Sequence, residues 1–541
     1  MHARDRIVRY NEHIGIAEKA FAMLTNTSFA PVQTMIESTN PATGDPLGRV
    51  TVTTPEAITT AMHNARLAQP AWERRGLRQR LALMHNLQNA MYRNLDRIID
   101  CVVAEQGKPR FEAFSEFWPS IELIAYYRRN APHILASRRE FINLSPHRRH
   151  SIEYRAHGVV LVIAPWNFPL VLSMSPIVAA LIGGNTVLYK PSEYATQTGE
   201  VITRVIHEAG IPRDVFQVIQ GYGDVGAALV SAHPDKICFT GSVATGRKVA
   251  ATAGELLIPL TLELGGKDAA IVLEDADLDR AARGLAWAGM FNAGQACLSV
   301  ERIYAMRSIA EPLVEKMAQV VRESMHLGAG ADPQTTVGAI TNEAQIKIIE
   351  SQVQEAVAQG ARVVTGGQRL QNGHNGHSRR GRFYTPTILT QVTPEMRVVK
   401  DETFGPVIVV VPVDSAEEAL RQANDTRYGL TGSVWTRDRA RGLALARQMR
   451  VGNAGVNDHI VSASMPHLPW GGVGDSGYGR TRGMEGLREM MTTQALSVDR
   501  LTLPNELFWY PYSARKMTLM RRIMQLLYGE TLIDRLRAVL P

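Results

Sequence analysis

Three side chains in this 541-residue sequence are of the types that covalent acyl transfer needs. Cys297 lies in a loop of small residues (291–299), Glu263 stands close before a pair of glycines, and Asn167 lies in a proline-bounded segment (165–169). A thiol is a nucleophile, a carboxylate is a base, and an amide can donate a hydrogen bond to an oxyanion. We therefore predict that Cys297, Glu263 and Asn167 are catalytic.

The other two cysteines have a different setting. Cys101 and Cys238 lie in apolar runs, which is typical of small buried side chains. Three cysteines without a C-x-x-C pair predict neither a disulfide framework nor a zinc site, and the 15 histidines show no metal-binding spacing. We expect no catalytic metal and a reducing, cytoplasmic location, where a thiol stays free.

The composition narrows the class of protein further. With 45% hydrophobic and 21% charged residues the chain has the composition of a soluble globular protein, and its length predicts two or three domains. The net charge of +7 comes from scattered basic residues, so we do not expect nucleic-acid binding. No apolar run is long enough to span a bilayer, and the charged N-terminus lacks the apolar core of a secretion signal.

The elements that must position these side chains follow an alternating pattern. We predict strands at 159–163, 185–190, 215–219 and 236–240, with helices at 170–181, 198–209 and 227–231 between them. This alternation predicts a doubly wound, mostly parallel α/β sheet, which binds ligands at the carboxyl ends of its strands. Asn167, Lys190, Glu193 and Ser242 each follow a predicted strand and are therefore site candidates.

A second α/β segment begins at the predicted strand 269–273 and reaches another at 407–412. Helices are expected around 311–325 and 343–358 within it, and residues 77–105 near the start of the chain also show helical spacing.

Two glycine-containing turns could each bind the phosphates of a dinucleotide. Residues 221–226 match G-x-G-x-x-G, with Gly223 at its centre, and Gly241 with Ser242 forms a second turn between a strand and a helix. Both cannot hold the same phosphates, so the sequence pattern alone leaves the choice open. Glu193 could accept from a ribose 2′-hydroxyl and would repel a 2′-phosphate, which favours NAD over NADP.

The chain resembles the NAD(P)-dependent aldehyde dehydrogenase superfamily from about residue 38 to 500. The resemblance rests on six motifs in the family's order, at residues 165–169, 190–193, 239–242, 263–267, 294–297 and 402–406. It implies a Rossmann-like cofactor domain, an α/β catalytic domain and a small β oligomerisation element. The implied boundaries are an N-terminal extension at 1–37, a cofactor domain at 38–145 and 159–263, a catalytic domain at 264–485, an oligomerisation hairpin and strand at 146–158 and 486–500, and an extension at 501–541.

The resemblance also implies residue roles. It places the diphosphate at Gly241 and Ser242, and NAD is the expected cofactor, with NADP as the alternative. Glu263 implies a hydrolytic enzyme that makes a free acid, because acyl-CoA-forming relatives lack this carboxylate. The implied cofactor contacts are Ile163, Trp166, Lys190, Glu193, Gly223, Gly241, Ser242, Gly265, Glu402 and Phe404.

The expected substrate is a small-molecule aldehyde. Succinate-semialdehyde enzymes of the family commonly carry an arginine near the position of Ser175, so that substrate would need an arginine from elsewhere, such as Arg302. Met465, Leu468 and Trp470 predict an apolar funnel for aliphatic or aromatic aldehydes. The alternatives are a succinate-semialdehyde enzyme and a catalytically idle structural protein on the same fold.

The tail extends beyond typical members of the family. Residues 513–541 contain two apolar helical stripes flanked by arginine and lysine, preceded by an aromatic cluster at 508–512. The tail fits either peripheral membrane contact through residues 508–541 or a helical hairpin docked on the body or a partner subunit. The resemblance further implies a homodimer or homotetramer.

Overall fold

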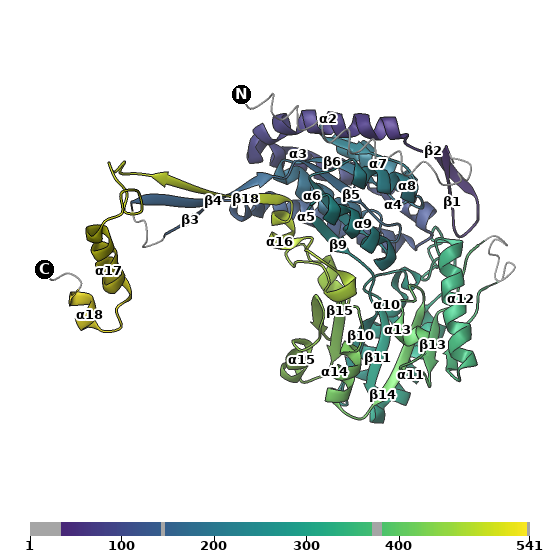
Figure 1. The fold of residues 1–541 in the computed structure, drawn as a ribbon. Helices are drawn as coiled ribbons and strands as arrows, with labels where there is room; N and C mark the ends of the chain where they lie inside the picture. Colours follow the sequence, from purple (N-terminus) through teal and green to yellow (C-terminus); the bar gives the residue numbers. More distant parts are fainter. Residues whose placement is uncertain (1–33, 142–146, 371–380, 538–541) are drawn as a thin grey trace. The chain divides into compact units, whose positions relative to one another are not determined.

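A computed structural model of the chain describes residues 34–141, 147–370 and 381–537 (Figure 1). The chain divides into two compact units, one of Met1–Ile134 with Ala156–Met491 and one of Leu135–Arg155 with Thr492–Pro541. Nearly all of the extension predicted at 1–37 lies outside the described residues.

A six-stranded sheet in the first unit carries most of the predicted site candidates. Its strand order is β17-β9-β8-β5-β6-β7, and only β17 runs antiparallel to its neighbour. The strands are β5 (Val159–Ile163), β6 (Thr186–Lys190), β7 (Phe216–Val218), β8 (Lys236–Thr240), β9 (Leu260–Glu263) and β17 (Gly477–Tyr478). Strand β5 is apolar throughout because helices cover both faces of the sheet.

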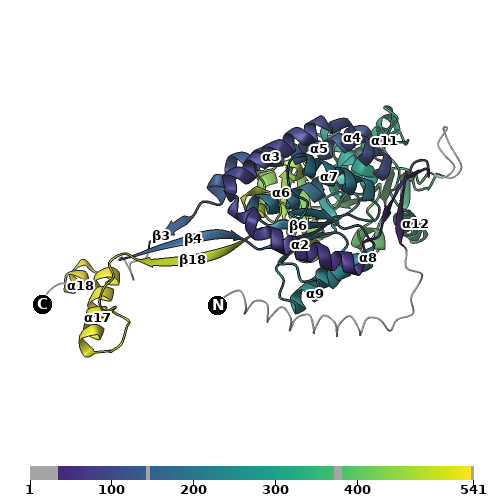
Figure 2. The same cartoon turned by 90° about the horizontal axis from the view of Figure 1, so that it is seen from above.

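Two layers of helices cover this sheet, on opposite sides of β6 (Figure 2). One layer contains α2 (Pro55–Arg74), α8 (Gly223–Ser231) and α9 (Val243–Glu255), which share a core with Val159 and Leu161 of β5. The other contains α3 (Gly76–Arg93), α4 (Leu95–Gln106), α5 (Arg110–Ile134), α6 (Val171–Gly183) and α7 (Thr196–Glu208). Every residue of α6 is buried, so this helix forms the inner wall below the strand ends.

The helical spacing predicted across 77–105 is interrupted in the structure. Helix α3 ends and α4 begins at Asn94, whose backbone leaves helical geometry with φ −100° and ψ 15°. The side-chain amide of Asn94 donates to the carbonyl of Ala90 at 2.9 Å. Asparagine side chains compete in this way with backbone hydrogen bonds, which explains the break.

A seven-stranded sheet forms the second half of the same unit, in the order β12-β13-β14-β11-β10-β15-β16. Its strands are β10 (Asp268–Val272), β11 (Val300–Met306), β12 (Arg362–Thr365), β13 (Thr387–Thr390), β14 (Val407–Val413), β15 (Thr431–Trp435) and β16 (Asn453–Val456). Its helices are α10 (Leu278–Met290), α11 (Arg307–Ser324), α12 (Glu343–Ala358), α13 (Arg397–Lys400), α14 (Ala416–Asn424) and α15 (Arg439–Ala446). Helices α10 and α11 pack on one face of this sheet, and α14 and α15 pack on the other.

Two further pieces of the first unit lie outside these two sheets. A short antiparallel pair, β1 (Met35–Thr39) and β2 (Pro46–Thr51), precedes α2. Helix α16 (Gly483–Arg488) follows β17 near the end of the unit.

The second unit contains a three-stranded sheet in the order β18-β4-β3 and two helices. The strands are β3 (Arg138–Glu140), β4 (Arg148–Ala156) and β18 (Met491–Asp499), and the helices are α17 (Ala514–Tyr528) and α18 (Leu532–Arg537). None of the residues of α17 is buried. Over the described part of the chain, no helix has the length and hydropathy needed to cross a membrane.

One group of side chains in the second unit has the spacing of metal ligands, namely His147, Asp499 and Glu506. The Glu506 carboxylate already accepts hydrogen bonds from Arg148 at 2.9 Å and from the His147 ring at 3.1 Å. An arginine in this position repels a cation, so we interpret the group as an ion-pair cluster.

Candidate active site

The loop that carries Cys297 has an unusual backbone. Asn292 and Ala293, in the short 3-10 helix after α10, both have positive φ angles of 55° and 53°, and Gly294 has φ 70°. A Cβ at Gly294 would lie 2.0 Å from the carbonyl oxygen of Gly405. Only glycine fits this close approach, which joins the cysteine loop to the segment that carries Glu402 and Phe404.

The glycine pair after Glu263 permits two further close approaches. A Cβ at Gly265 would lie 2.2 Å from the Glu402 carboxylate, and one at Gly266 would lie 2.4 Å from the Cys297 carbonyl oxygen. The missing side chains therefore allow the segments of Glu263, Cys297 and Glu402 to meet. The predicted motifs converge on one site of the first unit.

Cys297 needs a base before it can act as a nucleophile. Burial and then the negative charge of Glu263 raise the pKa of the Cys297 thiol well above its usual range. Burial also raises the pKa of Cys101 and of Cys238 to about 12. Cys101 is half-buried, and Cys238 is buried and lines the same small cavity as Glu263.

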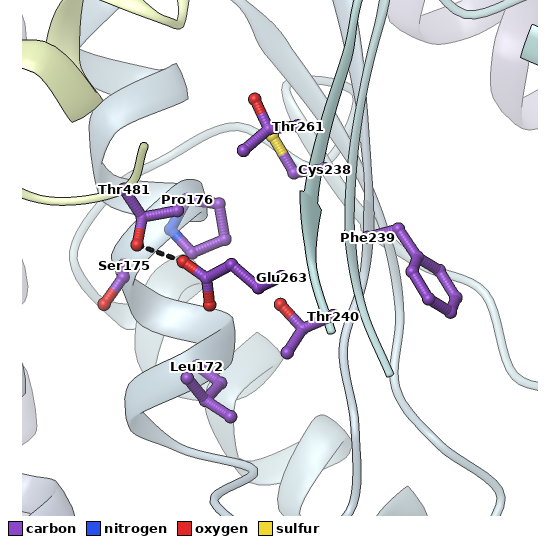
Figure 3. A pocket seen from close by; sticks show the side chains of 9 residues that line it. All are labelled: Leu172, Ser175, Pro176, Cys238, Phe239, Thr240, Thr261, Glu263 and Thr481. Atoms are coloured by element: carbon purple, nitrogen blue, oxygen red, sulfur yellow. Dashed lines mark hydrogen bonds between the residues drawn. The ribbon is translucent and has the colours of Figure 1, made fainter. Parts of the chain in front are cut away.

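Glu263, the last residue of β9, reaches into a small cavity (Figure 3). The side chain is 5% exposed, and the hydroxyl of Thr481 donates a hydrogen bond to its carboxylate. Ser175 and Pro176 of α6 and Thr240 of β8 line the same cavity. Burial raises the pKa of Glu263, which suits a group that must take up a proton.

Asn167 is held from two sides. Its side-chain amide donates to the carbonyl of Gln295 at 3.0 Å, next to the cysteine loop. Its own carbonyl accepts from the Lys108 ammonium at 2.6 Å, and Lys108 is paired with Glu116 at 2.5 Å in a fully buried ion pair. The sequence pattern gave no sign of Lys108 or Glu116, because their role depends on contacts between α5 and the strand ends.

Several of the predicted cofactor contacts lie at the carboxyl ends of the strands of the first sheet. Ile163 and Lys190 are register partners at the ends of β5 and β6, and Ser242 caps α9 by accepting from the Thr245 N–H. Burial lowers the pKa of Lys190, whose ammonium donates to the Pro191 carbonyl at 3.1 Å. Glu193 lies close enough for its negative charge to oppose that shift.

Of the two glycine turns, the one at Gly241 leads into the longer and side-chain-capped helix. Gly223 is instead the first residue of α8, and a Cβ there would meet open space. Gly241 precedes Ser242, so the free N–H groups at the start of α9 face the carboxyl edge of the sheet.

Glu402 and Phe404 lie in the segment between α13 and β14. Glu402 accepts from the Gly266 N–H at 2.9 Å, and burial raises its pKa to about 8. Phe404 has φ 53°, and its ring meets that of Trp166 edge-on with centroids 5.5 Å apart. Its N–H donates at 2.9 Å to the Glu301 carboxylate, a contact that the sequence did not predict.

The substrate walls differ in part from the sequence-based expectation. Trp470 is buried and shares an apolar cluster with Cys297, whereas Leu468 is exposed. Arg302 is ruled out as a substrate-binding arginine, because its guanidinium donates to the carbonyls of Lys267, Gln422 and Ala423.

The two sheets of the first unit and the order of the motifs along them are those of a dehydrogenase of the α/β class. The model of the aldehyde dehydrogenase family matches residues 29–496, and the chain belongs to this family. The predicted resemblance, fold class and enzyme class are confirmed by this match and by the relatives that follow.

Three relatives illustrate the range of the family. The chain is 36% identical over 502 residues to a 4,4'-diapolycopene aldehyde oxidase of Methylomonas sp, covering 92% of both chains. It is 38% identical over 461 residues to a putative succinate-semialdehyde dehydrogenase [NADP(+)] of Mycolicibacterium smegmatis, covering 85% of this chain and 88% of that one. An aldehyde dehydrogenase of Mycobacterium tuberculosis solved with NAD+ superposes with a TM-score of 0.81 at 32% identity, covering 87% and 95%.

Proposed function

We propose that this protein oxidises an aldehyde to a carboxylic acid through a thioester on Cys297. The single observation that carries the proposal is the convergence of Cys297, Glu263 and Asn167 through the close approaches at the glycine pair. Overall, an aldehyde, NAD(P)+ and water become a carboxylate, NAD(P)H and two protons.

Glu263 acts twice in this scheme. It first takes the proton of the Cys297 thiol, and the thiolate sulfur then forms a bond to the aldehyde carbon. The resulting oxyanion accepts hydrogen bonds from the Asn167 amide and the Cys297 backbone N–H. After oxidation to the thioester, Glu263 releases the thiol proton to solvent. It then removes a proton from the water that attacks the acyl carbon, and the acid leaves as Cys297 is regenerated.

A nicotinamide dinucleotide fits the carboxyl edge of the first sheet. When bound, it accepts the hydride that the aldehyde carbon loses. Lys190, Glu193 and Ser242 would hold its ribose and phosphates, and Glu402 with Phe404 would hold the nicotinamide end. The buried ammonium of Lys190 and the free N–H groups of α9 supply the donors for this fit. Glu193 favours NAD over NADP, because a 2′-phosphate would meet its charge.

Two classes of aldehyde suit different parts of the pocket. Met465, Leu468 and Trp470 offer apolar surface to an aliphatic or aromatic aldehyde, whereas a buried cation at Arg482 favours an aldehyde with a carboxylate. The relatives named above include an aldehyde oxidase and a putative succinate-semialdehyde dehydrogenase. A catalytically idle structural protein is the remaining alternative, and it does not explain why these side chains meet at one site. Such a protein would give no aldehyde-dependent NADH signal.

The second unit supports two further proposals. The sheet of β18, β4 and β3 would join subunits of a homodimer or homotetramer in the cytoplasm. Helix α17 and the aromatic residues before it would contact an anionic membrane surface, since exposed Trp509, Leu519 and Met524 accompany Arg521 and Arg522.

The Glu263→Gln variant tests the proposed chemistry. With NAD+ and aldehyde it is expected to form about one NADH per active site, more slowly than the unmodified protein because Cys297 has lost its base, and then nearly to stop because the thioester cannot be hydrolysed. Cys297→Ser, the control, is expected to give no burst. Unchanged steady-state formation of acid by Glu263→Gln would contradict the proposal.

A further inference from the structure

Arg482 is a buried cation next to the reacting groups, and no role was predicted for it. It immediately precedes α16, and its side chain is only 6% exposed. Its φ of 58° is unusual for a residue with a side chain and marks a conformation that the surrounding structure must enforce.

The backbone around Arg482 is fixed on both sides. Thr481 exchanges two backbone hydrogen bonds with Trp470 at 2.7 and 2.8 Å, and the Gly483 N–H donates to Pro466 at 2.9 Å. The Tyr127 hydroxyl donates to the Gly483 carbonyl at 3.1 Å. The direction of the Arg482 side chain is therefore set by the fold.

The guanidinium has unused hydrogen-bonding capacity. Its Nε donates a long bond of 3.4 Å to the Ser175 hydroxyl, and its Cζ lies 6.0 Å from the centre of the Trp470 ring. Its Nη1 is buried and has no hydrogen-bond partner among the described residues. Leaving a charged donor buried and unpaired is costly, which makes such a group a candidate for ligand binding.

Three other buried cations of this unit have hydrogen-bond partners within the fold. Lys108 and Lys267 each pair with a buried glutamate, and Arg302 donates to three backbone carbonyls. The contrast shows that the fold provides partners where a buried cation has a structural role. Arg482 therefore needs a different explanation.

The Arg482 side chain contacts residues that border the reacting groups. Its partner Ser175 lines the cavity of Glu263, and its neighbour Thr481 donates to Glu263 (Figure 3). Trp470, over which the guanidinium lies, packs in one cluster with Cys297. An anion bound at Nη1 would thus lie close to the nucleophile.

We propose that Arg482 is a substrate-binding residue that selects short aldehydes carrying a carboxylate at the far end. The inference rests on the proposed function, because it assumes that the aldehyde carbon reaches Cys297. The carboxylate accepts from Nη1, which completes the hydrogen bonds of the guanidinium. Sequence reasoning weakened this substrate class because Ser175 is not an arginine, but Arg482 brings a guanidinium to Ser175 from another element.

Kinetics with two aldehydes of equal chain length test the proposal. The protein is expected to show a kcat/KM for succinate semialdehyde about 10- to 100-fold above that for butanal. Because the charge of Arg482 lowers the pKa of Glu263, Arg482→Gln should slow the reaction of both aldehydes, but the loss on succinate semialdehyde should exceed the loss on butanal by about tenfold or more. Arg480→Gln is the matched control. Like Arg482, Arg480 lowers the pKa of Glu263, but its guanidinium already donates to the carbonyls of Gly472 and Gly479. This control should affect both aldehydes alike.

A binding measurement separates the two proposals. Calorimetric titration of butanoate into the full-length protein is expected to show binding that Arg482→Gln weakens about tenfold or more, with 1-butanol as the neutral probe. Equal losses for both aldehydes, a wild-type preference for butanal, or unchanged butanoate affinity would each overturn the role of Arg482. Absence of NADH with every aldehyde, alongside Arg482-dependent butanoate binding, would instead contradict the proposed oxidation.

Discussion

At the scale of single residues, the proposed chemistry depends on titratable groups whose pKa values are shifted by burial. Burial raises the pKa of Cys297 and of Glu263, and the negative charge of Glu263 raises that of Cys297 further. The amide of Asn167 uses one N–H for Gln295 and has a second N–H available for an oxyanion.

Replacing Asn167 with alanine tests that second N–H. Loss of one oxyanion donor typically lowers kcat by about 10²–10³, and we expect this fall in the rate of the NADH burst. Thermal unfolding and NAD+ affinity serve as controls and should change little. A burst rate equal to that of the unmodified protein would exclude Asn167 from the oxyanion site.

Several of these residues could be predicted from the sequence, and others could not. Cys297, Glu263 and Asn167 stand in recognisable local patterns of small residues, glycines and prolines. Arg482, Thr481 and Lys108 act through contacts with residues that are distant in sequence, and no local pattern marks them.

At the scale of elements, local sequence patterns predicted the positions of regular strands and helices better than they predicted breaks within a helix. Strand β8 and helix α12 begin and end at the predicted residues, because apolar runs and caps are local signals. The break at Asn94 depends on one side-chain hydrogen bond within an otherwise helical pattern. Helix α5 contains two buried glutamates, Glu116, which pairs with Lys108, and Glu112, which lies one turn earlier.

Glu112 predicts a pH dependence of stability. Burial raises the pKa of Glu112 to about 8 in the folded protein, whereas a glutamate in an unfolded chain has a pKa of about 4.3. The protonated Glu112 side chain contributes fully to the free energy of unfolding below about pH 4.3. This contribution is lost as the pH rises through about 8. In this window the free energy of unfolding should fall by about 1.4 kcal/mol per pH unit from this group.

Glu112→Gln, which keeps the shape but cannot ionise, should remove that contribution. Urea unfolding measured from pH 5 to pH 9 is expected to show the variant gaining stability relative to the unmodified protein as the pH rises. Parallel stability curves for the two proteins would show that Glu112 is not protonated in the folded state.

At the scale of the whole molecule, the tail adds a surface that the catalytic chemistry does not use. Helix α17 exposes an apolar stripe and carries four basic residues in its sequence, which matches the composition of helices that lie at anionic membrane surfaces. The sequence predicted both stripes of the tail, but periodicity cannot identify what covers them.

Deletion of residues 513–541 tests the membrane contact. The shortened protein should keep its kcat with a water-soluble aldehyde and lose flotation with vesicles that contain phosphatidylglycerol. The paired variant Arg521→Glu and Arg522→Glu should lose flotation without losing α17, because the attraction is largely electrostatic. Equal recovery of all three proteins in the soluble fraction would favour docking of the tail on protein instead.

The most direct test of the central claim is the mass of Glu263→Gln after reaction with NAD+ and an aldehyde. We predict a covalent acyl group on about one residue per chain, located by peptide analysis at Cys297 and absent from Cys297→Ser. An acyl group on another residue, or an unmodified Cys297 in a variant that still forms acid at the full rate, would contradict the account.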